Sequence, residues 1–255
     1  MSPTTTLIGS GDIIVGAWRN FRRNIRTYAE CMLWFVLLRV VQWGLTVLTE
    51  RFIADRALRF GVDILFAIPI MLLYTALTIS LIEMVASQLR DGRAGGRVTL
   101  RPGLRKLLPL IWVSIIVGVL VSLGFIVFII PGVLLLVWYR FSQDFVILDG
   151  LRGRAALIAS KKLVAGRWWK AFTRIALPGI FYMVAVMFVT YLCYFIASAI
   201  LRDSGAFFGQ LTTKASLPTA HVLIKTVLTA AINGLALPLF VASDLILWYE
   251  LKRAA

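Results

Sequence analysis

The stretch Leu107–Tyr139, LLPLIWVSIIVGVLVSLGFIVFIIPGVLLLVWY, runs for 33 residues without a charged side chain. A helix crosses the ~30 Å of hydrocarbon in a bilayer with about 20 apolar residues, so this stretch is too long for one crossing. Pro131-Gly132 lies inside it, and such a pair favours a turn. We therefore expect a tight hairpin there and a second crossing over 131–148. The alternative is a re-entrant break followed by a half-helix, which Arg140 and Asp144 keep open.

Other apolar runs of this kind fill most of the chain. Apolar residues make up 60% of the 255 residues and charged residues 15%, whereas soluble domains have roughly 25% charged residues. Strands of a membrane barrel would be ~10 residues long with alternating polarity, and that pattern is absent. The sequence predicts an all-α fold, a polytopic bundle in one integral membrane domain over 1–255. Its six transmembrane helices are expected at 28–48, 62–84, 107–130, 131–148, 175–201 and 222–247.

The basic residues alternate between the segments that join these spans. With residue 1 inside, one side receives nineteen of them, or twenty with Arg140 of the span 131–148, and the other receives five: Arg51, Arg56, Arg59, Arg202 and Lys214. Short loops rich in Lys and Arg stay in the cytoplasm. We therefore expect a multi-pass protein of the cytoplasmic (inner) membrane with both termini inside. No signal peptide is expected, because Ile13–Val15 is too short for its apolar core.

Two basic segments have amphipathic character. In 10–27 the apolar residues recur at helical spacing, and arginines occupy the other faces. This pattern is typical of a helix that lies in the membrane interface; alternatively the segment begins the first span. A second amphipathic segment covers 150–174, where a helix over Arg152–Ala165 is expected to stop at Gly166, before Trp168-Trp169. The lipid-headgroup ligands expected from both segments are Arg19, Arg22, Arg23, Arg26, Lys161, Lys162, Arg167 and Lys170.

These basic residues point to membrane lipids as partners. The formal charge is +15, but its carriers lie in short segments beside spans, where anionic headgroups attract them. We therefore expect anionic phospholipids, and no nucleic acid, as partners. The sequence does not indicate a protein partner or an oligomeric state.

Ionisable side chains inside spans are the candidate functional residues, because burying them in lipid is costly. Arg39 and Arg140 fall near the middle of their spans, and Asp144 follows Arg140 at i+4, where the two can pair. These groups either hold the helices together or line a polar cavity with Gln42, Gln143 and Asn233. Because two arginines outnumber one aspartate, such a ligand-binding cavity would suit an anion.

Signatures of catalysis are missing from the sequence. His221 has no Cys, Asp or Glu at ligand spacing, so no metal is expected. Cys31 and Cys193 are single and far apart, typical of small buried side chains. No nucleophile with a placed base and no nucleotide-binding loop is present. We expect no enzyme activity and no cofactor; a membrane enzyme would have to use the acids inside the spans.

Two parts of the chain resemble a broad group of six-helix bacterial membrane proteins. The first is Gly16–Asn24, GAWRNFRRN, and the second is Pro131–Val137, PGVLLLV, followed by Asp149-Gly150, Ala156, Ser160, Leu163 and Gly166-Arg167-Trp168. The group looks like the membrane domain of some glycerophosphoryl diester phosphodiesterases. The resemblance implies six membrane helices. It does not carry the activity over, because that activity belongs to a separate soluble barrel. The chain departs from the pattern at Ala159-Ser160, where the group often has Arg-Ser.

The sequence favours a non-enzymatic integral membrane protein that engages anionic phospholipid in envelope or lipid-related housekeeping. The alternative is a small-solute or anion transporter with a polar cavity at Arg39, Arg140 and Asp144.

Overall fold

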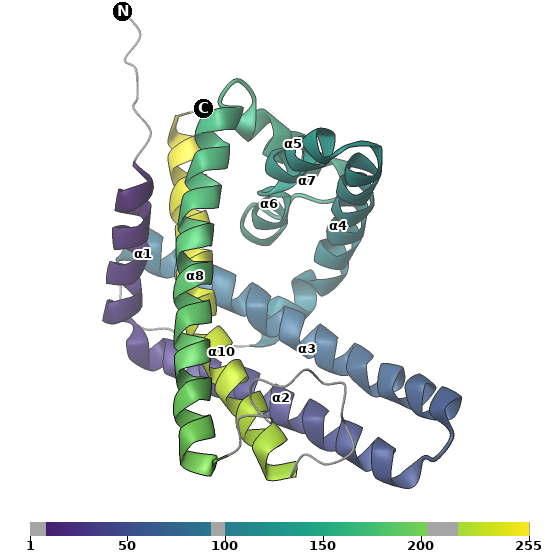
Figure 1. Ribbon diagram of the computed structural model, residues 1–255. Helices are drawn as coiled ribbons and strands as arrows, with labels where there is room; N and C mark the ends of the chain where they lie inside the picture. Colours follow the sequence, from purple (N-terminus) through teal and green to yellow (C-terminus); the bar gives the residue numbers. More distant parts are fainter. Residues whose placement is uncertain (1–8, 93–99, 203–218, 255) are drawn as a thin grey trace, which may run out of the picture. The chain divides into compact units, whose positions relative to one another are not determined.

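A computed structural model describes residues 9–92, 100–202 and 219–254, and it is all-α over these ranges (Figure 1). Apolar runs without strand-like alternation form helices here because a helix satisfies its own backbone hydrogen bonds in lipid. The predicted fold class is confirmed. The helices are α1 (Ser10–Arg23), α2 (Ile25–Phe52), α3 (Arg56–Asp91), α4 (Leu100–Val127), α5 (Ile129–Tyr139), α6 (Ser142–Leu148), α7 (Arg154–Val164), α8 (Trp168–Leu201) and α10 (Thr219–Arg253).

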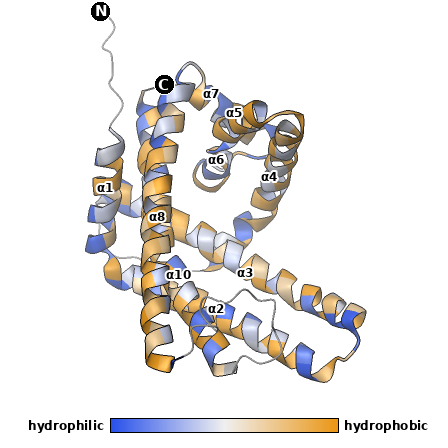
Figure 2. Ribbon diagram, in the orientation of Figure 1, coloured by the Kyte–Doolittle hydropathy of each residue, from blue (hydrophilic) through white to orange (hydrophobic). Residues whose placement is uncertain are grey.

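Six helical stretches of the described residues are long and apolar enough to cross a membrane: Ile25–Phe52, Arg56–Asp91, Gly103–Val127, Ile129–Leu148, Trp168–Leu201 and Ala220–Arg253. Each contains most of one predicted span. Hydrophobic residues cover most of α5 and α8 (Figure 2). Several helices extend beyond their apolar runs. The 36 residues of α3 measure roughly 54 Å, well beyond the hydrocarbon thickness.

The turn between the third and fourth spans lies earlier than the sequence predicts. Phe128 is extended, with φ −164° and ψ 158°, and separates α4 from α5. Pro131-Gly132 instead falls within the first turn of α5. A proline is tolerated there because the first amides of a helix have no intrahelical acceptor. The expected hairpin at Pro131-Gly132 is therefore wrong in position.

The fourth span is two short helices and not one. α5 has 11 residues and α6 has 7, with the break at Arg140-Phe141. At 1.5 Å per residue they measure roughly 17 and 10 Å, so neither alone matches the ~30 Å of hydrocarbon. The break places Arg140 near the middle of the fourth candidate span.

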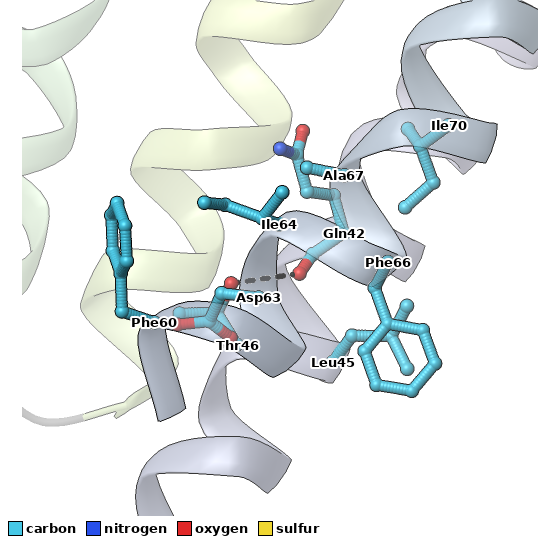
Figure 3. A pocket seen from close by; sticks show the side chains of 9 residues that line it. All are labelled: Gln42, Leu45, Thr46, Phe60, Asp63, Ile64, Phe66, Ala67 and Ile70. Carbon is cyan, nitrogen blue, oxygen red and sulfur yellow. Dashed lines mark hydrogen bonds between the residues drawn. The ribbon is translucent and has the colours of Figure 1, made fainter. Parts of the chain in front are cut away.

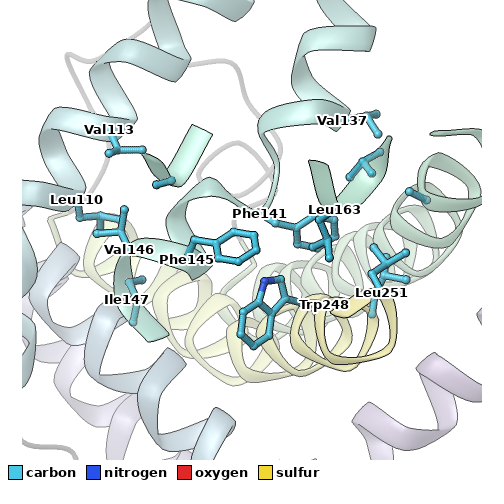
Figure 4. Close-up of a cluster of buried hydrophobic side chains, with 14 of the residues drawn as sticks. Leu110, Val113, Val137, Phe141, Phe145, Val146, Ile147, Leu163, Trp248 and Leu251 are labelled. Carbon is cyan, nitrogen blue, oxygen red and sulfur yellow. The ribbon is translucent and has the colours of Figure 1, made fainter. Parts of the chain in front are cut away.

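The chain forms two compact units, each built from segments that are distant in sequence. The first unit takes the described residues of 1–25, 75–180 and 238–255. Its core gathers apolar side chains from the middle and the C-terminal part of the chain. Phe145 of α6 meets Trp248 of α10 edge to face, with ring centroids 5.6 Å apart (Figure 4). This core joins α10 to the α4–α7 segment.

The second unit takes the described residues of 26–74 and 181–237. Gly234 of α10 lies against Met32 of α2, where a Cβ would come 3.2 Å from the Met32 Cα. The Tyr194 hydroxyl lies 2.5 Å from the Thr229 hydroxyl and joins α8 to α10. Close contacts of small residues and hydrogen bonds between helices are the usual means of packing in lipid.

At three points the chain passes from one unit to the other inside a long helix, close to a proline. They come between residues 74 and 75 in α3, 180 and 181 in α8, and 237 and 238 in α10. Pro69, Pro178 and Pro238 lie within these helices. Each proline removes one backbone donor and weakens its helix at that point. These prolines thus lie close to the unit boundaries.

The two amphipathic segments form helices that pack on the first unit. α1 ends at Arg23 and α2 begins at Ile25, so the N-terminal segment is a separate helix. Its buried face is Ile13, Ala17 and Phe21, whereas Trp18 is half exposed. α7 ends close to the expected stop: Val164 is its last residue, and Gly166 follows with φ +74°. Both helices bury an apolar face against protein and expose basic residues.

Candidate functional site

The best candidate site surrounds Arg140, at the break between α5 and α6. Its guanidinium forms an ion pair with Asp244 of α10, through Nη2 and Oδ2. The two residues are 104 positions apart in the chain, so no local sequence pattern predicts this ion pair. About a third of the Arg140 side chain stays exposed, at 37%. The ion pair therefore fixes the guanidinium and leaves part of it accessible.

Asp144 lies in the first turn of α6 and is 7% exposed. The sequence predicts an ion pair with Arg140 at i+4, but the structure gives that role to Asp244. Asp144 still interacts electrostatically with both Arg140 and Asp244. Within the described residues its carboxyl makes no hydrogen bond. The expected surplus of positive charge is absent at Arg140, because two carboxyls accompany one guanidinium.

A groove of about 350 Å³ runs beside Arg140, between α4 and the α5–α6 segment. Its polar end is formed by Arg140, Tyr139 and the Gln143 amide, which donates to the Ser114 hydroxyl at 3.2 Å. Its other end is mostly apolar. The nine lining residues are Ser114, Val117, Gly118, Val121, Ser122, Leu136, Tyr139, Arg140 and Gln143. Ser114, Gly118 and Ser122 follow one another at four-residue spacing along the α4 side of this groove.

The remaining predicted ligand residues belong to the second unit. Arg39 is exposed on α2 and donates to the Gln42 side chain at 2.9 Å, one helical turn away. Asn233 is exposed on α10. The structure thus gathers Arg140, Gln143 and Asp144 in the first unit, while Arg39, Gln42 and Asn233 lie in the second.

Gln42 also lines a smaller pocket of about 210 Å³ between α2 and α3 (Figure 3). Thr46 donates to the Gln42 carbonyl at 3.1 Å inside this pocket. Asp63 lies beside it and accepts a hydrogen bond from Thr49 at 2.7 Å. Its polar groups are largely occupied by one another, so this pocket is a weaker candidate than the groove.

The predicted headgroup ligands are mostly exposed. Those of the first unit lie on α1, on α7 and at the start of α8: Arg19, Arg22, Arg23, Lys161, Lys162 and Lys170. Arg26 is exposed in the second unit. Arg167 differs, because it is half-buried and donates to the Ala254 carbonyl. Lys161 lies 4.6 Å from the centroid of the Trp138 ring. Within the described residues Arg19, Arg22, Arg23 and Lys162 make no ion pair.

A cluster of paired charges at one end of the first unit was missed by sequence reasoning. Lys106 pairs with Glu83 and also donates to the Ile147 carbonyl at 2.5 Å. Lys252 pairs with Asp149 at 2.7 Å. These residues line a pocket of about 320 Å³ together with Arg90. The sequence shows only that each of these charged residues lies at the border of an apolar run, which does not predict how they pair.

Among the described residues no group of three His, Cys, Asp or Glu side chains is placed to hold a metal ion. Comparison with known proteins found no matching family model, no matching curated protein and no matching solved structure. The assignment of function therefore rests on the geometry and chemistry of the groove and of the basic surface.

Proposed function

We propose that this chain is a non-enzymatic, multi-pass protein of the cytoplasmic membrane that engages anionic phospholipid through α1, α7 and the start of α8. The observation that supports this proposal is the pairing of exposed bases with exposed tryptophans on the first unit. Trp18 and Trp169 are 50% and 70% exposed beside Arg19 and Lys170. Tryptophans favour the headgroup level, and basic side chains favour anionic lipid.

The buried faces of α1 and α7 give these bases a fixed position. Ile13 and Ala156 are fully buried in the core of the first unit, so the two helices cannot leave it without exposing apolar surface. The bases opposite these faces then remain on the outside of the first unit and need no ordering when lipid binds. The resemblance to six-helix bacterial membrane proteins is part of this proposal, for architecture and location alone.

The test compares two triple variants of the full-length protein in mild detergent. Arg19→Gln/Arg22→Gln/Arg23→Gln removes bases of α1, whereas Arg51→Gln/Arg56→Gln/Arg59→Gln removes as many at the end of α2 and the start of α3. Each base near anionic lipid contributes about 1 kcal/mol, so the α1 variant should bind phosphatidylglycerol roughly a hundredfold more weakly. The matched control should keep its affinity.

The readout is the rise in Tm on adding phosphatidylglycerol, with phosphatidylcholine as the neutral lipid. Raised salt should reduce the rise, because ions screen exposed charges. An equal response to both lipids, or an equal loss in both triple variants, would remove the proposal.

A second candidate is a transporter of small anionic solutes, supported by the groove at Arg140. It requires water to reach Gln143 and Arg140. Gln143→Cys in a background without Cys31 and Cys193 should then react with a membrane-impermeant thiol reagent. An inert thiol in a folded protein would remove the transporter and leave the phospholipid proposal standing.

A further inference from the structure

We propose that the groove between α4 and the α5–α6 segment binds a fatty-acid-type amphiphile, with its carboxylate at Arg140 and its acyl chain along α4. This inference deepens the second candidate function, from which it takes the location of the site. It concerns binding, and it holds whether or not the ligand is moved across the membrane.

The two ends of the groove differ in chemistry. Arg140, Gln143 and Ser114 supply N–H and O–H groups at one end. Val117, Val121 and Leu136 supply apolar walls toward the other end. From Ser114 to Ser122 the groove follows α4 for about 12 Å. A ligand with a polar head and a hydrocarbon chain matches this order of groups.

Arg140 is the one charged side chain among the described residues that line the groove. Its Nη2 is engaged by Asp244 on α10, which leaves the N–H groups on Nη1 and Nε for a ligand. Asp244 and Asp144 do not line the groove. Asp244 thus holds the guanidinium from outside the groove, and the accessible part presents donors in a plane. A planar carboxylate is the anion that fits this fork best.

The depth and size of the groove select a carboxylate over a phospholipid. Arg140 lies near the middle of the candidate span Ile129–Leu148. Carrying a phosphate to that depth would desolvate a permanent charge, whereas a carboxylic acid can lose its charge by taking up a proton from water before it enters. A volume of about 350 Å³ is near the lower limit of ligand pockets, which suits one acyl chain better than two.

Contacts between helices of the first unit close the groove at each of its two ends. Gly124 and Gly132 bring α4 and α5 together at the apolar end. The hydrogen bond from Gln143 to Ser114 joins α6 to α4 at the other end. The neighbouring α4 residues Ile115 and Val119 do not line the groove, and each is 54% exposed.

The experiment uses the full-length protein in lipid nanodiscs and a palmitate that carries a photoreactive diazirine. Labelled peptides should come from Ser114–Ser122 or from Leu136–Gln143. Unlabelled palmitate should compete with the probe, and hexadecanol, which has the same chain without the acid, should not. Labelling confined to other helices, or equal competition by hexadecanol, would overturn the inference.

Variants distinguish the groove from nonspecific partition into lipid. Gly118→Phe fills the groove and keeps every charge; a Cβ on Gly118 meets no atom within 4 Å, so its backbone tolerates a side chain. It should lower labelling about tenfold to a hundredfold, as should Arg140→Gln/Asp244→Asn, which removes the guanidinium and its partner together. Val119→Phe, on the exposed side of α4, should label as the wild type does.

Gly118→Phe decides the question if the double charge variant does not fold, since no ion pair is touched. Wild-type labelling in folded Gly118→Phe would overturn the inference. Uptake of radiolabelled palmitate into proteoliposomes separates the two proposals. Binding of palmitate without uptake would refute the transporter proposal and leave the binding site standing. Absence of specific labelling in the groove would refute this inference alone.

Discussion

Gly124 of α4 lies directly against Gly132 of α5, where a Cβ on Gly124 would come 3.0 Å from the Gly132 Cα. The contact forms the tight end of the α4–α5 hairpin, just before the turn at Phe128. A side chain on either glycine has to push the two helices apart.

We therefore expect Gly124→Val to destabilise the protein by about 1–3 kcal/mol, the usual cost of overpacking. Thermal unfolding in detergent measures it as a lower Tm. Gly118→Ala is the matched control on the same helix, because its Cβ would meet no atom within 4 Å. A Tm equal to wild type for Gly124→Val would show that α4 and α5 do not touch there.

The ion pair between Arg140 and Asp244 should show strong coupling. Asp244→Asn leaves the guanidinium without its partner, and Arg140→Gln leaves two carboxyls without a cation. Each single variant should lose about 1–3 kcal/mol of unfolding free energy, and the double variant should lose less than the sum. A double-mutant cycle in chemical denaturant measures this coupling. Additive losses would mean that the two side chains do not interact.

Trp248 should be the most sensitive tryptophan of the first unit. It is 2% exposed and packs on Phe145, so Trp248→Ala should cost about 3–5 kcal/mol. Trp248→Phe should cost less, because the indole N–H has no hydrogen-bond partner within the described residues. Trp169→Ala is the control at a 70% exposed position and should leave the Tm nearly unchanged. Equal losses of Tm for Trp248→Ala and Trp169→Ala would contradict the burial of Trp248 in the core of the first unit.

The two glutamates that pair with basic residues in the first unit should differ in importance. Glu83 holds Lys106, which also donates to the Ile147 carbonyl, so Glu83→Gln disturbs a contact among α3, α4 and α6. We expect a loss of about 1–3 kcal/mol. Glu250 pairs with Arg253, whose side chain is 78% exposed, and Glu250→Gln should cost at most about 1 kcal/mol. A reversed order of Tm values would refute this ranking.

The proposed orientation can be tested in intact cells. In a background without Cys31 and Cys193, Lys162→Cys should resist a membrane-impermeant thiol reagent, because the proposed orientation puts α7 on the cytoplasmic side. Arg56→Cys, at the start of α3, should react with it. Both side chains are exposed in the structure, so burial does not explain a difference. Labelling at Lys162→Cys without lysis would reverse the proposed topology.

Hydropathy predicts the long helices well, because a span needs a run of apolar residues and little else. It predicts their ends poorly. Arg and Lys are good helix formers, so α3 continues through Arg90 after its apolar run has ended. The turn before α5 was misplaced for a related reason: Pro131 is compatible with the first turn of a helix, and Gly132 is needed there for its contact with α4.

The candidate site was predictable only in part. Mid-span Arg140 stands out because charge is rare in lipid, and Gln143 follows within one turn. Its ionic partner, however, is Asp244, whose approach depends on the tertiary packing of α10 and on no local spacing. The hydrogen bond from Arg39 to Gln42 shows the opposite case, a local contact at i+3 that satisfies the arginine without a distant partner.

The first unit draws its core from both early and late parts of the chain, and this fixes the order of biosynthesis. Phe145 and Leu163 leave the ribosome long before Trp248 and Leu251, which complete the same core. The earlier helices must therefore wait, inserted but incompletely packed, until 238–253 have been translated. A stop codon early in α10 would leave Arg140 without Asp244 and the core open, and such a product should be removed by membrane proteases.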